Sequence, residues 1–212
     1  MDSLILHSFR RCPFAIRVRM VLEEKQISYE LREEKLSQLS SELLSLHPEG
    51  RVPLLIHQQG IPGEPGSQKQ VIYQSTIITE YLDEAFPEVP LMPTDPMDRA
   101  QVRLWTYWCD HLFKPDLDLF KYDQSTLSDS EAELLRARLH GHLAYWDSTL
   151  QSGSFLLGAK LGMTLADIHL FPFARQFMGI QPALPGIEKY KNLAVWLSMM
   201  ISRPAFVRVM AK

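Results

Sequence analysis

The sequence Arg11-Cys12-Pro13-Phe14-Ala15 joins two segments of different character near the start of the chain. The residues before it, Leu4–Phe9, are mostly apolar and predict a short strand. The residues from Phe14 to Glu24 carry apolar side chains at helical spacing and predict a helix. Cys12 therefore falls where a strand ends and a helix begins. Pro13 takes the first helical position, where the N–H that proline lacks would have no partner.

This position bears on the chemistry of the Cys12 thiol. A side chain at a helix N-terminus faces unpaired N–H groups and the positive end of the helix dipole. Such an environment lowers a cysteine pKa from about 8.5 to roughly 3.5–7.5, and Arg10, Arg11 and Arg17 add positive charge nearby. The pattern favours a reactive thiol, and the alternative is a small buried side chain that only packs.

The composition limits the classes of function. The chain has 212 residues, 46% hydrophobic and 22% charged, which is typical of a globular protein with one large domain or two small ones. A net charge of −3 argues against nucleic acid as the main partner. Two cysteines, Cys12 and Cys109, form no disulfide framework, so we expect a cytoplasmic location. The sequence has no signal peptide and no apolar run long enough for a membrane span.

The first part of the chain predicts alternating strands and helices. Polar and apolar residues alternate over Ile27–Arg32, and a right-handed crossover would make this strand parallel to the first. Pro53 lacks a ladder donor, so Val52-Pro53 is expected at a turn into the strand of Arg51–Ile56. The other predicted elements are a helix over Ser40–Leu46, an exposed loop over Gln58–Gln70, a strand over Val71–Tyr73, and a helix over Thr76–Phe86 with Ser75 as N-cap.

A proline-rich segment divides the chain. Four prolines within Phe86–Pro96 predict a linker, beyond which the periodicity is helical. We predict an α/β domain over residues 1–85, a linker over 86–97 and an all-helical domain over 98–212. The helices are expected over Met97–Tyr122 with a bend at Pro115, Ser128–Gln151, Thr164–Met178, Ile187–Ile201 and Pro204–Met210. Capping-box spacing opens the second and third of these helices, and the third is apolar around most of its surface.

Four features occur in a characteristic order: Cys12-Pro13 at the first helix, Val52-Pro53 before a hairpin, Gln74-Ser75 at the next helix, and an all-helical second half. In this order they resemble the cytosolic glutathione transferase family, specifically its cysteine-type omega- and beta-like members, over essentially the whole chain. The resemblance implies a thioredoxin-like N-terminal domain that holds glutathione, an all-helical domain that supplies most of a second-substrate pocket, and a homodimer. It implies no metal.

The resemblance also implies roles for individual residues. The backbone of Val52 would pair with the cysteine of glutathione as an added strand, next to a cis Pro53. Gln74 and Ser75 would hold the γ-glutamyl end, since a hydroxyl and an N–H at a helix N-terminus suit a carboxylate. Ser75 is equally suited to a plain capping role, and Gln74 to a solvated loop.

Several further residues each have two candidate roles. Arg51 would meet the glycine carboxylate of glutathione or remain a surface residue, and Phe14 would pad the thiol pocket or belong to the core. His47 precedes a proline where the family often has asparagine, and we interpret it as a turn residue. Candidate residues for a hydrophobic second-substrate pocket are Trp105, Trp108 and Leu112, whose spacing also suits core packing, with Cys109 as inert packing between them.

The nucleophile decides the expected chemistry. Family members with Tyr or Ser at the catalytic position conjugate glutathione to electrophiles, whereas those with Cys form a mixed disulfide with glutathione. No second cysteine follows Cys12 at CxxC spacing, so a second glutathione would resolve the mixed disulfide. We therefore predict glutathione-dependent thiol transfer or reduction with weak conjugation, acting on a hydrophobic electrophile or a mixed disulfide. Ser8 is a competing nucleophile, but its position is too early for the junction.

Two other functions compete with this prediction. The segment from Ile77 to Pro93 resembles bacterial proteins of the stringent starvation protein A type, which bind RNA polymerase and have lost glutathione chemistry. Cys12-Pro13 favours the enzyme, because an interaction module has no need of a thiol at a helix N-terminus. Isomerisation of a small unsaturated acid, as in zeta-like members, is a third function, but their serine-rich start is missing here.

Overall fold

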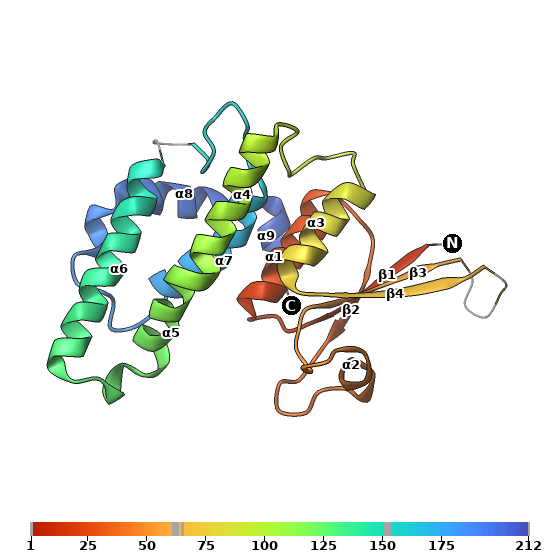
Figure 1. The fold of residues 1–212 in the computed structure, drawn as a ribbon, viewed down its shortest axis with the longest axis horizontal. Coiled ribbons are helices and arrows are strands. Elements are labelled where there is room, and N and C mark those ends of the chain that lie inside the picture. The colour runs from red at the N-terminus through yellow and green to blue at the C-terminus, as the bar shows by residue number, and fades with distance from the viewer. Residues whose placement is uncertain (1, 61–63, 65, 151–153, 212) are drawn as a thin grey trace. The chain divides into compact units, whose positions relative to one another are not determined.

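The structure is a computed structural model that describes residues 2–60, 64, 66–150 and 154–211 (Figure 1). It divides into two compact units, the first comprising residues 1–90 and 204–212 and the second residues 91–203. Unit 1 is a mixed four-stranded sheet with helices, and unit 2 is helical. The predicted fold class, a thioredoxin-like domain followed by an all-helical domain, is confirmed.

The sheet of unit 1 has the strand order β2-β1-β3-β4. As predicted, β1 pairs in parallel with β2, whereas β3 is antiparallel to both of its neighbours. The hairpin strands reach further than expected, so they take up the ends of the predicted loop over Gln58–Gln70, of which residues 61–63 and 65 lie outside the described part. The strands are β1 (Ser3–Ser8), β2 (Glu30–Glu33), β3 (Leu54–Gln59) and β4 (Gln68–Tyr73).

Helices cover both faces of this sheet (Figure 1). Helices α1 (Pro13–Glu24) and α3 (Ser75–Ala85) pack against each other on one face. On the other face, α2 (Ser41–Leu46) buries Leu43 against two residues of β3, Leu54 and Ile56. These apolar contacts fix where the ends of α2 and α3 lie relative to the start of α1.

The last helix of the chain, α9 (Pro204–Met210), belongs to unit 1, although the predicted helical domain runs to residue 212. It packs against α1, where Arg10 and Arg19 donate to the last carbonyls of α9. Arg208 of α9 also pairs with Glu23 at 2.6 Å. The division between the units falls after Pro90, and a helix already starts at Pro96, so the extended segment is shorter than the predicted linker 86–97.

A buried hydrogen-bond network holds the start of α2 to the sheet. His7 Nδ1 donates to Glu34 Oε1 at 2.7 Å, and the Ser40 hydroxyl and N–H donate to the same carboxylate at 2.6 and 2.8 Å. Ser40 is in turn the N-cap of α2. Burial alone would raise the pKa of Glu34, but the donors from Ser40 and His7 outweigh it and place the pKa below its usual value.

We expect Glu34→Gln to lower the free energy of unfolding by about 1.5–3 kcal/mol at pH 7, because it removes charge-assisted hydrogen bonds. Because the pKa of Glu34 is lower in the folded state than in the unfolded state, the unfolded state binds more protons at any pH between these two pKa values. The stabilisation is therefore complete above the unfolded-state pKa and is lost as the pH falls through the folded-state pKa. Urea unfolding of both proteins at pH 7 and in acid measures this. Equal stability at pH 7 would contradict the role of the network.

Unit 2 is built from helices α4 to α8. The predicted long helix over Met97–Tyr122 is interrupted by one π-helical turn, Cys109–Phe113, so the break begins before Pro115 and not at it. π-Helical turns of this kind re-aim side chains within an otherwise regular helix. The helices are α4 (Pro96–Trp108), α5 (Lys114–Tyr122), α6 (Asp129–Thr149), α7 (Leu165–Met178) and α8 (Lys191–Ile201), with short 3-10 turns at Gln124–Thr126 and Ile187–Lys189.

Helix α7 lies at the centre of unit 2, as its apolar surface predicts, and Asp167 anchors its first turn. The predicted capping box is present, with the Thr164 N–H donating to Asp167 at 3.0 Å. The same fully buried carboxylate accepts from the Leu156 N–H at 3.0 Å and from the indole of Trp196 at 2.9 Å. Burial raises the pKa of Asp167, against the opposing effect of these donors.

Asp167→Ala should lower the free energy of unfolding of unit 2 by about 3 kcal/mol or more, because it leaves several buried donors without partners at about 1–3 kcal/mol each. The matched control is Ser128→Ala in the exposed capping box of α6, where water replaces the lost acceptor and a smaller loss is expected. Urea unfolding measures both variants. Equal losses at the two boxes would be inconsistent with an anchoring role for Asp167.

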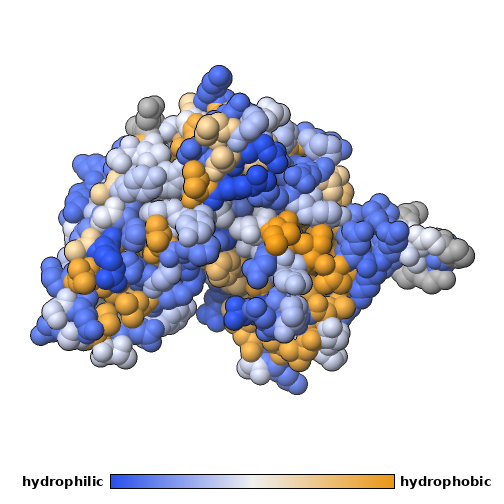
Figure 2. Space-filling model, viewed as in Figure 1, coloured by the Kyte–Doolittle hydropathy of each residue, from blue (hydrophilic) through white to orange (hydrophobic). Residues whose placement is uncertain are grey.

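Part of the surface of unit 1 is apolar. Exposed apolar side chains gather over α2 and its flanking segments, where Figure 2 shows hydrophobic surface, and they include Leu31, Leu36 and Leu44. Apolar patches of this kind often mark contact surfaces.

Within the described residues, no single helix is long and apolar enough to cross a membrane. The bent pair α8 and α9 reaches the necessary length and apolar composition only when the two helices are counted together.

Candidate active site

Cys12 occupies the N-cap position of α1. Its backbone is extended, its N–H donates to the Phe9 carbonyl at 2.9 Å, and its own carbonyl accepts the first helical hydrogen bond, from Ile16, at 2.9 Å. The side chain makes no capping bond and is partly exposed. Its sulfur lies 4.0 Å from the carbonyl oxygen of Val52. The thiol is therefore accessible at the positive end of a helix and close to the chain segment that precedes β3.

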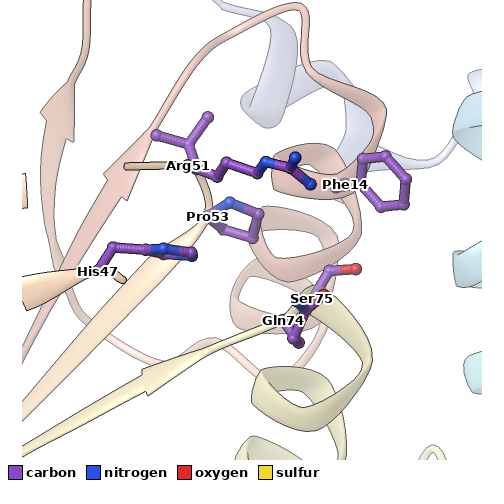
Figure 3. Close-up of a pocket in the computed structure, with 7 residues that line it drawn as sticks. Phe14, His47, Arg51, Pro53, Gln74 and Ser75 are labelled. Carbon is purple, nitrogen blue, oxygen red and sulfur yellow. The ribbon is translucent and has the colours of Figure 1, made fainter. Parts of the chain in front are cut away.

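A pocket opens beside this junction, within unit 1 (Figure 3). Arg51 and His47 approach it from the segment after α2, Phe14 from α1, and Gln74 and Ser75 from the start of α3 (Figure 3). No carboxylate is present among the described lining residues, and Arg51, the one charged side chain among them, pairs with Glu49 just outside this set. The lining residues are Phe14, His47, Arg51, Val52, Pro53, Gln74 and Ser75.

Val52 and Pro53 separate α2 from the sheet. The Val52–Pro53 peptide bond is cis, and β3 begins only after it, at Leu54. The pairing of β3 with β1 and with β4 likewise begins at Leu54, so the ladder does not include Val52. A backbone outside the ladder at the edge of a pocket can pair with an extended peptide.

Ser75 lies one position further into the helix than predicted. It is the first residue of α3, and Gln74, not Ser75, is at the N-cap position. The Ser75 hydroxyl is buried and accepts a hydrogen bond from Arg17 Nη1 at 3.3 Å. The guanidinium of Arg17, itself fully buried, also lies 5.2 Å from the ring centre of Phe14. A buried cation behind a helix N-terminus strengthens the attraction of this end of the pocket for an anion.

Gln74 has an unusual backbone conformation. Its φ of 72° and ψ of 116° lie outside the regions that residues other than glycine normally adopt. Such a conformation costs about 1–3 kcal/mol and is typical of functional sites. The chain turns at Gln74 from β4 into α3. This strained residue lines the pocket next to Ser75.

His47 is the lining residue that the sequence indicated only as a turn residue and not as a contact to a ligand. It follows the last residue of α2, and only 5% of its surface is exposed. Its Nδ1 accepts a hydrogen bond from the Glu49 N–H at 3.0 Å, and its ring packs on that of Tyr73 with 4.8 Å between centroids. Burial lowers the pKa of His47 below its usual value. A histidine before a proline is a weak signal in sequence, and only the packing of α2 brings it to the pocket.

Arg51 lies at the rim of the pocket. Its side chain is 74% exposed and pairs with Glu49 at 3.1 Å. An exposed ion pair of this kind adds little stability, so the guanidinium can exchange Glu49 for an anionic ligand. Both readings of Arg51, surface residue and ligand contact, are compatible with this position.

The competing nucleophile and the second cysteine are both enclosed. Ser8 at the end of β1 has no exposed surface, and Cys109 in the π-helical turn of unit 2 is also fully buried. Neither position suits a residue that must reach a substrate. Among the described residues, no cluster of three or more histidine, cysteine or acidic side chains is placed to hold a metal ion.

The residues predicted for a second-substrate pocket lie in unit 2. The ring of Trp105 is buried and stacks on Tyr145 at 4.9 Å, and it meets Trp108 edge-on at 5.4 Å. Leu112, in the π-helical turn, is 50% exposed. Trp105 therefore has a packing role in unit 2, whereas Leu112 presents an apolar surface.

The fold and this pocket define a class: proteins with a thioredoxin-like unit, a cysteine at the start of its first helix, and an all-helical unit. The family can then be named. Residues 6–90 match the model of the glutathione S-transferase N-terminal domain, and residues 129–198 match that of the C-terminal domain. The chain belongs to the glutathione S-transferase family, as the resemblance indicated.

Relatives of different kinds share this family. A probable glutathione S-transferase of Nicotiana tabacum is 31% identical over 92% of this chain and 82% of its own length. FtsZ-localized protein A of Caulobacter vibrioides is 28% identical over 97% of this chain and 90% of its own. The crystal structure of glutathione transferase Omega 3C from Trametes versicolor matches with a TM-score of 0.80 and 25% identity, over 99% of this chain and 85% of the other.

We expect Gln74→Gly to separate stability from ligand binding. Glycine adopts the φ of 72° without a Cβ clash, so the free energy of unfolding should rise by up to about 1 kcal/mol. The same change removes a polar side chain from the pocket, so glutathione should bind about 3- to 10-fold more weakly. Urea unfolding and calorimetric titration measure the two effects. A variant that binds glutathione like the wild type would exclude Gln74 from the site.

Proposed function

We propose that this protein is a cysteine-type glutathione transferase that catalyses glutathione-dependent thiol transfer. The observation that carries the proposal is the partly exposed Cys12 thiol at the N-terminus of α1, 4.0 Å from the Val52 carbonyl and beside the pocket. Tyrosine and serine nucleophiles stabilise the thiolate of glutathione itself. A cysteine in the same place can also form a disulfide with it.

The pocket supports an extended peptide bound along Val52. The backbone of Val52 would pair with the cysteinyl residue of glutathione and bring its sulfur toward Cys12. The N-terminus of α3, with Ser75 and the buried Arg17 behind it, suits the γ-glutamyl carboxylate. Gln74 would contact the same end of the ligand, and Arg51 at the rim would meet the glycyl carboxylate.

The proposed reaction proceeds in two disulfide exchanges. The Cys12 thiolate attacks the glutathionyl sulfur of a mixed disulfide R–S–S–G, so that the S–S bond breaks, R–S⁻ leaves and Cys12–S–S–G forms. A second glutathione, as thiolate, attacks the glutathionyl sulfur of this adduct, so that the S–S bond breaks, oxidised glutathione is released and the Cys12 thiolate leaves. The net change is R–S–S–G plus GSH to R–SH plus GSSG. No second thiol of the chain takes part, since Cys109 is buried in unit 2.

The helical unit would supply the contacts to the second substrate. Leu112 offers exposed apolar surface, and Trp105 and Trp108 form the aromatic packing close to it in the sequence. We propose a hydrophobic electrophile or mixed disulfide as that substrate, with conjugation as a weak side activity. The homodimer that the resemblance implies and the cytoplasmic location expected from the cysteine content remain predictions, and light scattering of the purified protein tests the first.

A binding function without catalysis is the second candidate. It is favoured by the relative whose name describes localisation with FtsZ and which spans 97% of this chain. A regulator of the stringent starvation protein A type, the alternative considered from the sequence, would also be a binding protein without catalysis. The accessible Cys12 favours the enzyme, because a purely binding surface does not require a thiol at a helix N-terminus.

Intact-mass measurement after treatment with oxidised glutathione tests the proposed function. We expect wild-type protein to gain the mass of one glutathionyl group and to lose it when reduced glutathione is added. Cys12→Ser should gain none and should lose the reductase activity toward a glutathionylated peptide by at least 100-fold. The buried Cys109→Ser is the matched control and should behave like the wild type.

Two results would decide against the enzyme. The first is a wild-type protein that takes up no glutathionyl group at Cys12, and the second is a Cys12→Ser variant with full reductase activity. Recovery of RNA polymerase or FtsZ with the protein from a lysate, together with either result, would favour the binding function.

A further inference from the structure

We propose that His47 is a positioning residue that recognises the glycyl end of glutathione by donating a hydrogen bond from its Nε2–H. The inference rests on the proposed function, because it concerns the same pocket. It adds a residue and a ligand group to that site, and it gives this end of the peptide a neutral hydrogen-bond donor in addition to the cationic Arg51.

The tautomer of His47 follows from its one hydrogen bond among the described residues. Nδ1 accepts from the backbone N–H of Glu49 at 3.0 Å, so this nitrogen carries a lone pair and no proton. A neutral imidazole has one N–H, which must then be at Nε2. Burial disfavours the charged ring and lowers its pKa, which keeps this neutral form at physiological pH.

The orientation of the ring is also fixed. The ring packs on Tyr73 of β4 with 4.8 Å between centroids and a 47° tilt. Its backbone is held at the end of α2, where the His47 N–H donates to Leu43 and its carbonyl accepts from Gly50. Figure 3 shows the ring directed toward the side of the pocket formed by Pro53 and Gln74. A donor held in this way loses little conformational entropy when a ligand binds.

The position of His47 selects which part of the ligand it meets. The γ-glutamyl end is assigned to Ser75 at α3, and the cysteinyl residue to Val52. The segment after α2, which carries His47 and Arg51, is left for the third residue of the tripeptide. Arg51 at the exposed rim supplies charge, whereas the nearly buried His47 supplies a directed hydrogen bond to an oxygen of the glycyl carboxylate.

Two substitutions distinguish the proposed Nε2–H donor of His47 from the hydrogen bond that its Nδ1 accepts from the Glu49 N–H. His47→Asn places an acceptor near the position of Nδ1, so it can keep the bond from Glu49, but it removes the donor that reaches the pocket. His47→Gln places an amide N–H near the position of Nε2 and can keep that donor. Calorimetric titration of each protein with glutathione and with γ-glutamylcysteine, which lacks the glycyl residue, gives the two affinities. Thermal unfolding checks that each variant is folded.

We expect wild type and His47→Gln to bind glutathione about 10-fold more tightly than γ-glutamylcysteine, or better. In His47→Asn this preference should fall to about 3-fold or less, with the affinity for γ-glutamylcysteine unchanged. An unchanged preference in a folded His47→Asn would overturn the inference and leave the proposed function intact, since the glutathionyl adduct at Cys12 would still form. A wild-type protein that binds neither peptide would overturn both.

Discussion

The hydrogen bond from Arg17 to Ser75 joins α1 to the first residue of α3, and the site depends on this contact between the two helices. Each helix begins where a strand ends, so each presents unpaired N–H groups at the same side of the sheet. One helix start carries the Cys12 thiol, and the other carries the proposed anion site. A buried guanidinium between them stabilises both the packing and the negative charge that a ligand would bring.

The sequence predicted the parts of the fold that depend on local pattern. Helical spacing, strand alternation and capping residues gave the order of elements, the parallel pair β1 and β2, and the capping box at Thr164 and Asp167. The proline-rich segment was recognised from composition. Six of the seven residues that line the pocket came from the resemblance to the family: Phe14, Arg51, Val52, Pro53, Gln74 and Ser75.

Features that arise from packing were not predictable in this way. His47 reaches the pocket only because Leu43 of α2 docks on β3, and nothing local in the sequence records that contact. Gln74 has a positive φ, which residues other than glycine seldom adopt, so the identity of the residue does not predict it. The break between α4 and α5 precedes Pro115, because it is a π-helical turn at Cys109–Phe113, and no residue type in the sequence marks such a turn as proline marks a kink.

The return of α9 to unit 1 makes that unit discontinuous along the chain. The strands and α1 are made before the helical unit, but Ala205, Phe206 and Val209, which α9 buries, are made after it. Until then the outer side of α1, with Arg10 and Arg19, lacks the carbonyls that they bind. The thiol-bearing unit is therefore complete only after the whole of the helical unit has been synthesised, although Cys12 itself is made long before.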